Sequence, residues 1–332
     1  MRAKIELFLI ALATALCSEQ APAQNLFEAD GRGGNVYEFT PGGAQSTFAS
    51  GFIYPWGLAL DGAGNLFVVD WGGGIYQFTT NGVQNTFVTG LDEPTGLAID
   101  GAGDLFVGSD HGYIYKFTTN GVQSTFAQLS DSISSLVFDG AGNLFVATDS
   151  GYIYKYTTGG AQSIFASGLS DDPTGLAFDG AGNLFVACNL GTIYRFTTNG
   201  VQSTFASGLD CPSALAFDSM GNLFEADRCS GNIYEFTTNS VRSTFASGLS
   251  YPSGLVFQPT PVSGGTSNRP PALNIAVVGN QIAIFWPAST NNYILVTATN
   301  LANPNWVAVT NGTSITGVTV TNTSPAQFFQ LQ

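Results

Sequence analysis

The chain has 332 residues, of which 10% are charged and 13% are aromatic, and its formal net charge is −14. A hydrophobic content of 44% can bury a large core and argues against disorder. So few cations cannot readily form the basic surface that a nucleic acid requires, and a single histidine excludes histidine-rich zinc sites. The 41 glycines and many aromatic residues are typical of an all-β protein, and the length allows about two domains.

Residues 1–23 have the pattern of a signal peptide. A basic start precedes the apolar run Leu7–Leu16, which is too short to span a bilayer, and Ala21–Ala23 forms an A-x-A cleavage site. We therefore expect cleavage before Gln24 and a secreted, periplasmic or cell-surface protein. No later segment is long and apolar enough for a transmembrane helix. Lipoprotein anchoring at Cys17 remains open as an alternative.

Four short sequence strings recur six times each between residues 25 and 258. The string N-L-F or D-L-F begins at Asn25, Asn65, Asp104, Asn143, Asn183 and Asn222. Each unit of about 40 residues thus holds four apolar runs separated by turn sequences such as D-G-A-G-N and T-T-N-G-V, which is the size of one propeller blade. The Asn-Gly turns favour hairpins, and the abundance of β-branched and aromatic residues excludes helical repeats of similar period.

The phase of the repeat predicts a closed ring. The first unit begins at its second strand, at Asn25, whereas the strand 253–257 stands alone after the sixth unit. Strand counts balance if this last strand joins the first blade, which also removes two open sheet edges. We predict an all-β fold in which residues 24–258 form a six-bladed β-propeller.

Two segments carry a family resemblance. P-T-G-L-A-I-D-G-A-G-D-L-F-V at 94–107 resembles an NHL repeat, as does P-T-G-L-A-F-D-G-A-G-N-L-F-V at 173–186. The units more broadly resemble six-bladed propellers grouped with gluconolactonases, the senescence marker protein and TolB-like domains. I-Y-R-F-T-T-N-G at 193–200 is similar to virginiamycin B lyase repeats. The resemblance covers residues 25–258 and implies a fold more strongly than a function.

The resemblance implies a metal-dependent enzyme, but this chain matches only part of the expected site. Gluconolactonase-like enzymes hold a metal through Glu, Asn and Asp, with one Asp just before the glycine of an inner strand. The six equivalent positions carry no carboxylate here and are Trp56, Thr95, Ser134, Thr174, Ser213 and Ser253. A virginiamycin-lyase-like mechanism needs a catalytic histidine with a nearby glutamate, and the candidate is His111, whose own loop holds no glutamate.

Residues 259–272 are rich in Pro, Gly, Ser and Thr and are expected to form a linker. Residues 273–332 contain alternating apolar runs separated by turns, and we predict a small antiparallel β-sandwich. It resembles the fibronectin type III-like tail modules of exported bacterial proteins. Trp286 and Trp306 are expected in its core, and carbohydrate stacking is the alternative.

The loops that join strands 2 and 3 of the blades share the face at the mouth of the channel, which is the usual ligand site of a propeller. They carry acidic or amide residues at similar positions, namely Asp30, Asp70, Asp110, Asp149, Asn189 and Asp227. The carboxylates could hold Ca²⁺ or another divalent metal, which prefers oxygen ligands. The alternative is that these residues only form turns.

Other candidates lie at the same face. Trp56 and Trp71 belong to one blade and could form an aromatic platform for a sugar or an apolar ligand, with packing over the rim as the alternative. The candidate ligand-binding residues are Trp56, Trp71, Asp70, Asp110, His111, Asp149, Asn189, Asp227 and Arg228.

The blades that close the ring carry two further features. Counting about the turns places Glu28 opposite Glu38, and Glu225 opposite Glu235, with Arg32 and Arg228 in the adjoining loops as neutralising cations; shared ancestry of two blades is the alternative. Cys211 and Cys229 lie in loops of one blade and can form a disulfide, whereas Cys188 is left over or competes for Cys211.

These observations favour an exported, monomeric binding scaffold that recognises a glycan, a peptide or a small molecule at the channel face. The tail module would serve attachment or partner contact. The alternative is a divalent-metal-dependent lactonase, esterase or virginiamycin-lyase-like enzyme with its site in the central channel.

Overall fold

The computed structural model describes residues 24–169 and 171–258, and the backbone of six strands between residues 274 and 331. The chain divides into two compact units, Met1–Thr260 and Pro261–Gln332. The predicted signal peptide, the linker and both tail tryptophans, Trp286 and Trp306, lie outside the described residues. Those expectations therefore stay predictions.

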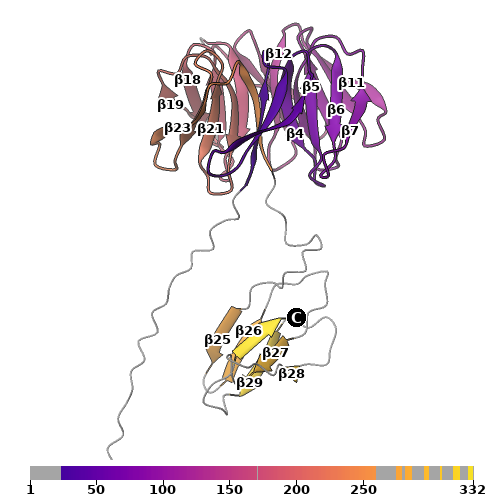
Figure 1. Cartoon of the computed structure of the whole chain (residues 1–332). Coiled ribbons are helices and arrows are strands. Elements are labelled where there is room, and N and C mark those ends of the chain that lie inside the picture. The colour runs from indigo at the N-terminus through magenta and orange to yellow at the C-terminus, as the bar shows by residue number, and fades with distance from the viewer. Residues whose placement is uncertain are drawn as a thin grey trace, which may run out of the picture. The chain divides into compact units, whose positions relative to one another are not determined.

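The first unit is an all-β propeller of six four-stranded antiparallel blades (Figure 1). Blade 1 contains β24 (Pro252–Phe257), β1 (Leu26–Asp30), β2 (Asn35–Phe39) and β3 (Gln45–Ser50). Blade 2 contains β4 (Pro55–Leu60), β5 (Leu66–Asp70), β6 (Gly74–Phe78) and β7 (Gln84–Val88). Blade 3 contains β8 (Pro94–Ile99), β9 (Leu105–Ser109), β10 (Tyr113–Phe117) and β11 (Gln123–Gln128).

The second half of the ring repeats this arrangement. Blade 4 contains β12 (Ile133–Phe138), β13 (Leu144–Thr148), β14 (Tyr152–Tyr156) and β15 (Gln162–Ala166). Blade 5 contains β16 (Pro173–Phe178), β17 (Leu184–Cys188), β18 (Thr192–Phe196) and β19 (Gln202–Ser207). Blade 6 contains β20 (Pro212–Phe217), β21 (Leu223–Asp227), β22 (Asn232–Phe236) and β23 (Arg242–Ser247).

The ring closes as the phase of the repeat predicts. Strand β24 pairs antiparallel with β1, with Leu26 opposite Phe257 and Ala29 opposite Gly254. A side chain at Gly254 would place its Cβ 2.6 Å from the carbonyl oxygen of Trp56 in the next blade. Glycine is therefore required at position 254, whereas Ser135 and Ala214 occupy the equivalent position in blades 4 and 6.

The core lies between neighbouring blades. Side chains of each second strand alternate between the two adjacent blades, so that Phe27 and Ala29 of β1 pack with Leu66 and Val68 of β5. Phenylalanines from the fourth strands contact them edge to face, as Phe48 does with Phe27 at a centroid distance of 5.0 Å. All five residues of every second strand are buried for this reason.

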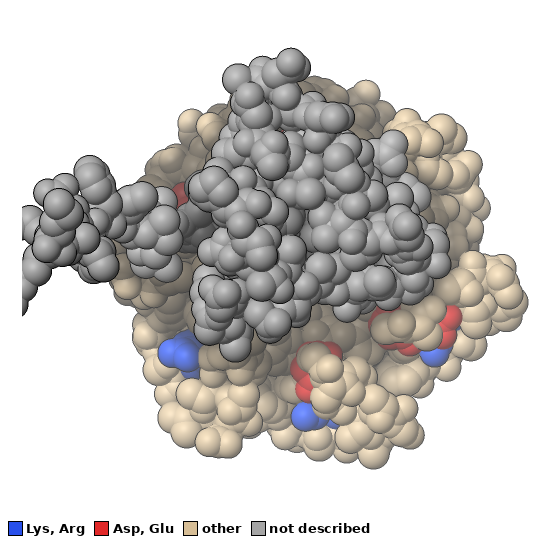
Figure 2. Space-filling model, turned by 90° about the horizontal axis from the view of Figure 1, so that it is seen from below, with Lys and Arg blue, Asp and Glu red and all other residues tan. Residues whose placement is uncertain are grey.

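The turns at the end opposite the mouth are shaped by repeated aspartates. The carboxylate of Asp61 accepts hydrogen bonds from the backbone of Ala63 and Asn65 and from the Asn65 side chain. Lys116 pairs with Asp104 at 2.8 Å on the same end, where Figure 2 shows acidic atoms in small groups beside basic ones. These acids hold turns, as Asx motifs do elsewhere.

The predicted cross-strand pairing of Glu28 with Glu38, and of Glu225 with Glu235, is wrong by one residue. Glu28 pairs with Tyr37, and Glu225 pairs with Tyr234, because the strands are joined in a register different from the symmetric count. The shift places both glutamates in the face between blades, where the other four blades carry the buried valines Val68, Val107, Val146 and Val186.

The described strands of the second unit form two three-stranded antiparallel sheets. One has the order β25 (Asn274–Val278), β26 (Gln281–Phe285) and β29 (Gly317–Thr321). The other has the order β28 (Val307–Ala308), β27 (Leu295–Ala298) and β30 (Phe328–Leu331). The fibronectin type III-like assignment stays a prediction. Among the residues that the structure describes, no helix is long and apolar enough to cross a membrane.

Candidate functional site

A pocket of about 440 Å³ lies at the mouth of the channel, where first strands begin and loops join the second and third strands. Blades 2 to 6 line it with Tyr54, Trp56, Trp71, Thr95, Asp110, Ile133, Ser134, Asp149, Asp172, Thr174, Asn189, Ser213 and Arg228. Six of the candidates from the sequence thus meet in one cavity. Asp70, His111 and Asp227 do not line it.

The acidic residues of the mouth form two sets rather than one ring. The second strand ends at Asp30, Asp70 and Asp227 in blades 1, 2 and 6, but at Ser109, Thr148 and Cys188 in blades 3, 4 and 5. Asp110, Asp149 and Asn189 each follow one residue later, in the loop itself. The two sets therefore occupy different positions of the repeat, one at the strand end and one in the loop, and their side chains contact different groups.

The first set supports backbone. The carboxylate of Asp70, which is 3% exposed, accepts hydrogen bonds from the N–H groups of Ile53 at 3.0 Å and Tyr54 at 2.7 Å. Asp227 accepts them from Asp210 and Ser230 in blade 6. Asp30 does the same for Ser250 and Tyr251 in blade 1. The turn-forming interpretation therefore describes Asp30, Asp70 and Asp227 better than a metal ring does.

The second set faces the pocket. Asp110, Asp149 and Asp172 come from three consecutive blades and form an acidic wall. Partial burial raises the pKa of Asp149, and the neighbouring Asp110 and Asp172 raise it further, while Arg228 lowers it. Arg228 thus acts on Asp149 across the same cavity.

The wall on the side of blades 1, 2 and 6 is aromatic and cationic. The rings of Tyr54 and Trp56 stack at a centroid distance of 5.5 Å, and Tyr251 meets Tyr54 edge to face at 5.7 Å. The guanidinium of Arg228 lies 5.8 Å from the Trp56 ring and 5.5 Å from the Tyr251 ring. Arg32 lies 4.5 Å over Tyr251. These are cation–π distances.

The same cluster raises the pKa of Tyr54. Burial and then the neighbouring Tyr251 raise the pKa of Tyr54 to about 12, although Arg32 and Arg228 oppose the shift. The phenol is protonated at neutral pH, as that of an unperturbed tyrosine also is, and can donate a hydrogen bond.

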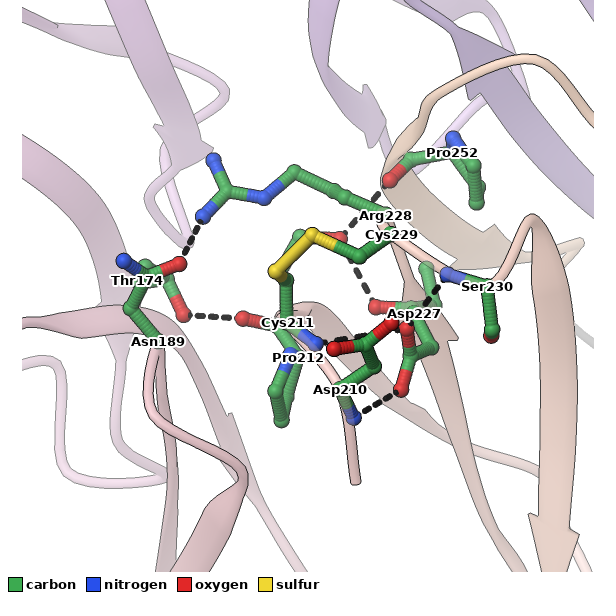
Figure 3. Close-up of a disulfide and its surroundings, with 12 residues drawn as sticks. Thr174, Asn189, Asp210, Cys211, Pro212, Asp227, Arg228, Cys229, Ser230 and Pro252 are labelled. Carbon is green, nitrogen blue, oxygen red and sulfur yellow. Dashed lines mark hydrogen bonds between the residues drawn. A yellow bond between two sulfur atoms is a disulfide. The ribbon is translucent and has the colours of Figure 1, made fainter.

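Arg228 is held in place from both sides (Figure 3). Its guanidinium donates a hydrogen bond of 2.6 Å to the side-chain oxygen of Asn189 in blade 5, and its backbone N–H donates to the carbonyl of Cys211. The next residue, Cys229, forms a disulfide with Cys211, with the Cα atoms 5.3 Å apart. Cys188 is instead a free, buried thiol in the core between blades 4 and 5, and burial raises its pKa to about 12.

A ring of hydroxyl groups surrounds the channel just inside the mouth. At the position before the inner-strand glycine, each hydroxyl donates to a carbonyl of the next blade, as Thr95 does to Ile133 at 2.6 Å and Ser253 does to Pro55 at 2.8 Å. Ser134, Thr174 and Ser213 make the equivalent bonds. Blade 2 departs from this ring because Trp56 occupies its position, in a β-bulge of β4 rather than in a loop.

His111 lies outside the pocket on the rim of blade 3. Its Nδ1 atom is 3.6 Å from a carboxylate oxygen of Asp92 and 3.8 Å from one of Glu93, and its side chain is 52% exposed. Glu93 belongs to the loop before β8 and has a positive φ of 42°. Sequence reasoning considered the histidine's own loop and therefore missed this glutamate.

The acidic wall does not fit a shared metal. Among the described residues, the one group of three or more His, Cys, Asp or Glu ligand atoms that lie close enough together is Asp210, Cys211 and Cys229. The two sulfurs of that group are bonded to each other and do not offer thiolates. The predicted ring of Asp30, Asp70, Asp110, Asp149 and Asp227 does not assemble in this way.

Solved structures with the same fold include proteins of different function. A streptogramin B lyase is 14% identical with a TM-score of 0.57, over 70% of this chain and 86% of that chain. A candidate gluconolactonase is 14% identical with a TM-score of 0.55, over 71% and 87%. An auxiliary nutrient binding protein from Bacteroides thetaiotaomicron is 12% identical with a TM-score of 0.55, over 70% and 71%. At this identity the likeness concerns the fold.

No family model matches the chain, and no curated protein matches it. The six-bladed propeller has structural neighbours among gluconolactonase-like and virginiamycin-lyase-like proteins. Because these show only the fold, the function has to be inferred from the residues of this chain.

Proposed function

We propose that this chain is an exported propeller that binds a ligand in the pocket at the channel mouth. The observation that carries the proposal is the replacement of a repeated hydroxyl residue by Trp56 in blade 2. Five blades use this position for a hydroxyl that joins neighbouring blades, whereas blade 2 gives up that bond and places an indole in the cavity. A large aromatic ring that replaces a structural hydrogen bond is best explained by contact with a ligand.

Binding is favoured over catalysis by the lining of the pocket. It offers aromatic rings, hydroxyls, aspartates and one arginine, but its lining includes neither histidine nor glutamate. The structural neighbours include both a lyase and a nutrient binding protein, so the fold itself is compatible with either role. In this proposal the N-terminal segment directs export, and the second unit serves attachment or partner contact.

The test uses Trp56→Ser, which restores the repeat residue. Panels of oligosaccharides, short peptides and small metabolites would be screened by calorimetry against the purified protein. We expect at least one probe to bind, and Trp56→Ser to weaken it at least tenfold without lowering the melting temperature. Leu190→Ala is a matched control, because Leu190 is an apolar rim side chain, 72% exposed, that does not line the pocket. Unchanged affinity in Trp56→Ser, or no binding by any probe, would refute the proposal.

The enzymatic alternative rests on His111 with Asp92 and Glu93. A lactone, an ester and a streptogramin B would each be incubated with the protein in the presence of Ca²⁺ or Mg²⁺, and again with a chelator. The binding proposal expects no turnover above the uncatalysed rate. Turnover that is lost in His111→Ala would replace it with the lactonase- or lyase-type function.

A further inference from the structure

The cations of the propeller are segregated. Lys116 and Lys155 pair with aspartates at the end opposite the mouth. Arg195 and Arg242 lie over the rings of their own blades, at Phe185 and Tyr234. Of the cations in the described residues, Arg32 and Arg228 alone lie beside the aromatic cluster of the mouth.

Arg228 has capacity for an anionic partner. Among the described residues, no carboxylate lies within 4.0 Å of its guanidinium, which bonds to the neutral amide of Asn189. Its Nε atom is buried and has no hydrogen-bond partner in the described part of the chain. A planar guanidinium that is fixed by one amide and backed by aromatic rings is well arranged to receive a carboxylate.

The opposite wall has capacity for a cation. Asp110, Asp149 and Asp172 line the same pocket, and none of them has a lysine or arginine within 4.0 Å in the described part of the chain. Two walls of opposite charge therefore share a cavity of about 440 Å³, and no ion pair joins them within 4.0 Å among the described residues. A cavity of this size accommodates a small organic molecule.

We infer that the pocket binds a short zwitterionic ligand, a peptide or amino-acid derivative with a free carboxylate and a protonated amine. The carboxylate pairs with Arg228, the amine lies against Asp110, Asp149 and Asp172, and an apolar side chain packs on Trp56. This inference rests on the proposed binding function and names its ligand class. A neutral glycan could stack on Trp56 but would leave both charged walls unpaired in a site that it dehydrates, which is costly. A metal ion would engage the acidic wall alone.

The first experiment removes one ligand charge at a time. The probes are the tripeptides Gly-Phe-Gly, Gly-Leu-Gly and Gly-Trp-Gly, each in the free form, N-acetylated, C-amidated and capped at both ends, titrated into the full purified protein by calorimetry. We expect at least one free peptide to bind, and each single cap to weaken it at least tenfold, or about 1.4 kcal/mol.

The second experiment removes the matching protein charge. In Arg228→Gln, the free and C-amidated peptides should bind equally, whereas the effect of N-acetylation persists. In Asp149→Asn, the effect of N-acetylation should decrease and that of amidation should persist. Arg242→Gln and Asp92→Asn are matched controls, because neither residue lines the pocket, and both should retain the full pattern. Circular dichroism and thermal unfolding verify that each variant is folded.

The outcomes separate this inference from the binding function. If an oligosaccharide or another probe binds in a Trp56-dependent manner while no tripeptide does, the zwitterion assignment is overturned and the binding function stands. Equal affinity for all four forms of a peptide also overturns it, as does binding of Ca²⁺ alone that is lost in Asp149→Asn. If nothing in either panel binds, both proposals fail.

Discussion

The two halves of the ring share one fold but use different residues. Blades 6, 1 and 2 end their second strands with aspartates that support backbone, and they carry the disulfide, both mouth arginines and the aromatic cluster. Blades 3, 4 and 5 end the same strands with Ser109, Thr148 and Cys188 and place their acids in the pocket or at the rim.

This difference indicates where function resides in a repeat protein. Positions that recur from blade to blade, such as the aspartate that opens the turn between the first two strands in blades 2 to 6, hold each blade together. Positions that differ between the halves converge on one cavity and give it two walls of opposite charge. Four predictions test this division, in order of decreasing expected effect.

The largest effect is expected from the disulfide of blade 6. In Cys211→Ser combined with Cys229→Ser, the free energy of unfolding should fall by about 3 kcal/mol, because a cross-link that spans 18 residues no longer restricts the unfolded chain. Denaturant unfolding measures this loss. Adding a reductant should destabilise the wild type but not the double variant. Equal stability of the two proteins without reductant would show that the cross-link contributes nothing.

The two sets of mouth aspartates should respond differently. Asp70→Ala should lower the free energy of unfolding by about 2 kcal/mol, because the N–H groups of Ile53 and Tyr54 lose a buried charged acceptor. Asp149→Ala, in the other half, should change it by less than about 0.5 kcal/mol. Chemical denaturation of both variants is the measurement. A comparable loss in Asp149→Ala would contradict the division into two sets.

Exchanging Glu28 or Glu225 for the valine of the other blades should stabilise the protein by about 1.5 kcal/mol each at neutral pH. Both carboxyl groups are fully buried, and none of their oxygens has a hydrogen-bond partner among the residues that the structure describes. Burial raises the pKa of each well above the ordinary 4.5, and Asp30 and Asp227 add to the respective shifts.

The sign of the pH dependence follows from these shifts. At these two sites the folded state binds protons that the unfolded state releases above about pH 4.5, so the contribution of each glutamate to stability is most favourable at low pH and falls as the pH rises. The slope contributed by each glutamate reaches about 1.4 kcal/mol per pH unit. Unfolding measured between pH 4 and pH 8 should show a shallower decline in Glu28→Val and Glu225→Val, and the wild-type slope in the surface variant Glu93→Gln. A wild-type slope in both valine variants would refute the assignment.

The smallest effect is expected from His111→Ala. The imidazole is half exposed and makes contacts longer than 3.5 Å with Asp92 and Glu93, so stability should change by less than about 0.5 kcal/mol. Peptide affinity should also be unchanged, because His111 does not line the pocket. A tenfold loss of affinity would move the binding site toward the rim of blade 3.

The propeller could be predicted from the sequence because strand order and ring closure follow from repeat spacing alone. The site was predictable only in part. Trp56, Asp149 and Arg228 were identified because they lie at the mouth, but Tyr54, Tyr251 and Asp172 were missed. Their signal is present, since the loops before the first strands vary most between units, yet only three-dimensional geometry shows which loop residues face the cavity.

The pairing of Glu28 and the grouping of Asp30 with Asp110 failed for a common reason. A shift of one residue exchanges the two faces of a strand, or moves a side chain from a strand end to a loop. The repeat strings locate each turn to within a residue or two, and that precision is sufficient for a fold but not for the orientation of a carboxylate. The strand pairings and strand ends of the structure give the register to the exact residue.

The pairing of β24 with β1 has a consequence for the newly made chain. The hydroxyl of Ser253 bonds to the carbonyl of Ala29 across 224 residues of sequence, so the first blade lacks its inner strand until nearly the whole propeller has been synthesised. Until then β1 presents an unpaired edge, and that edge can pair wrongly with another chain. The ring can therefore close only after its last strand has been made. Shortening the chain before residue 257 should produce aggregation rather than a smaller ring.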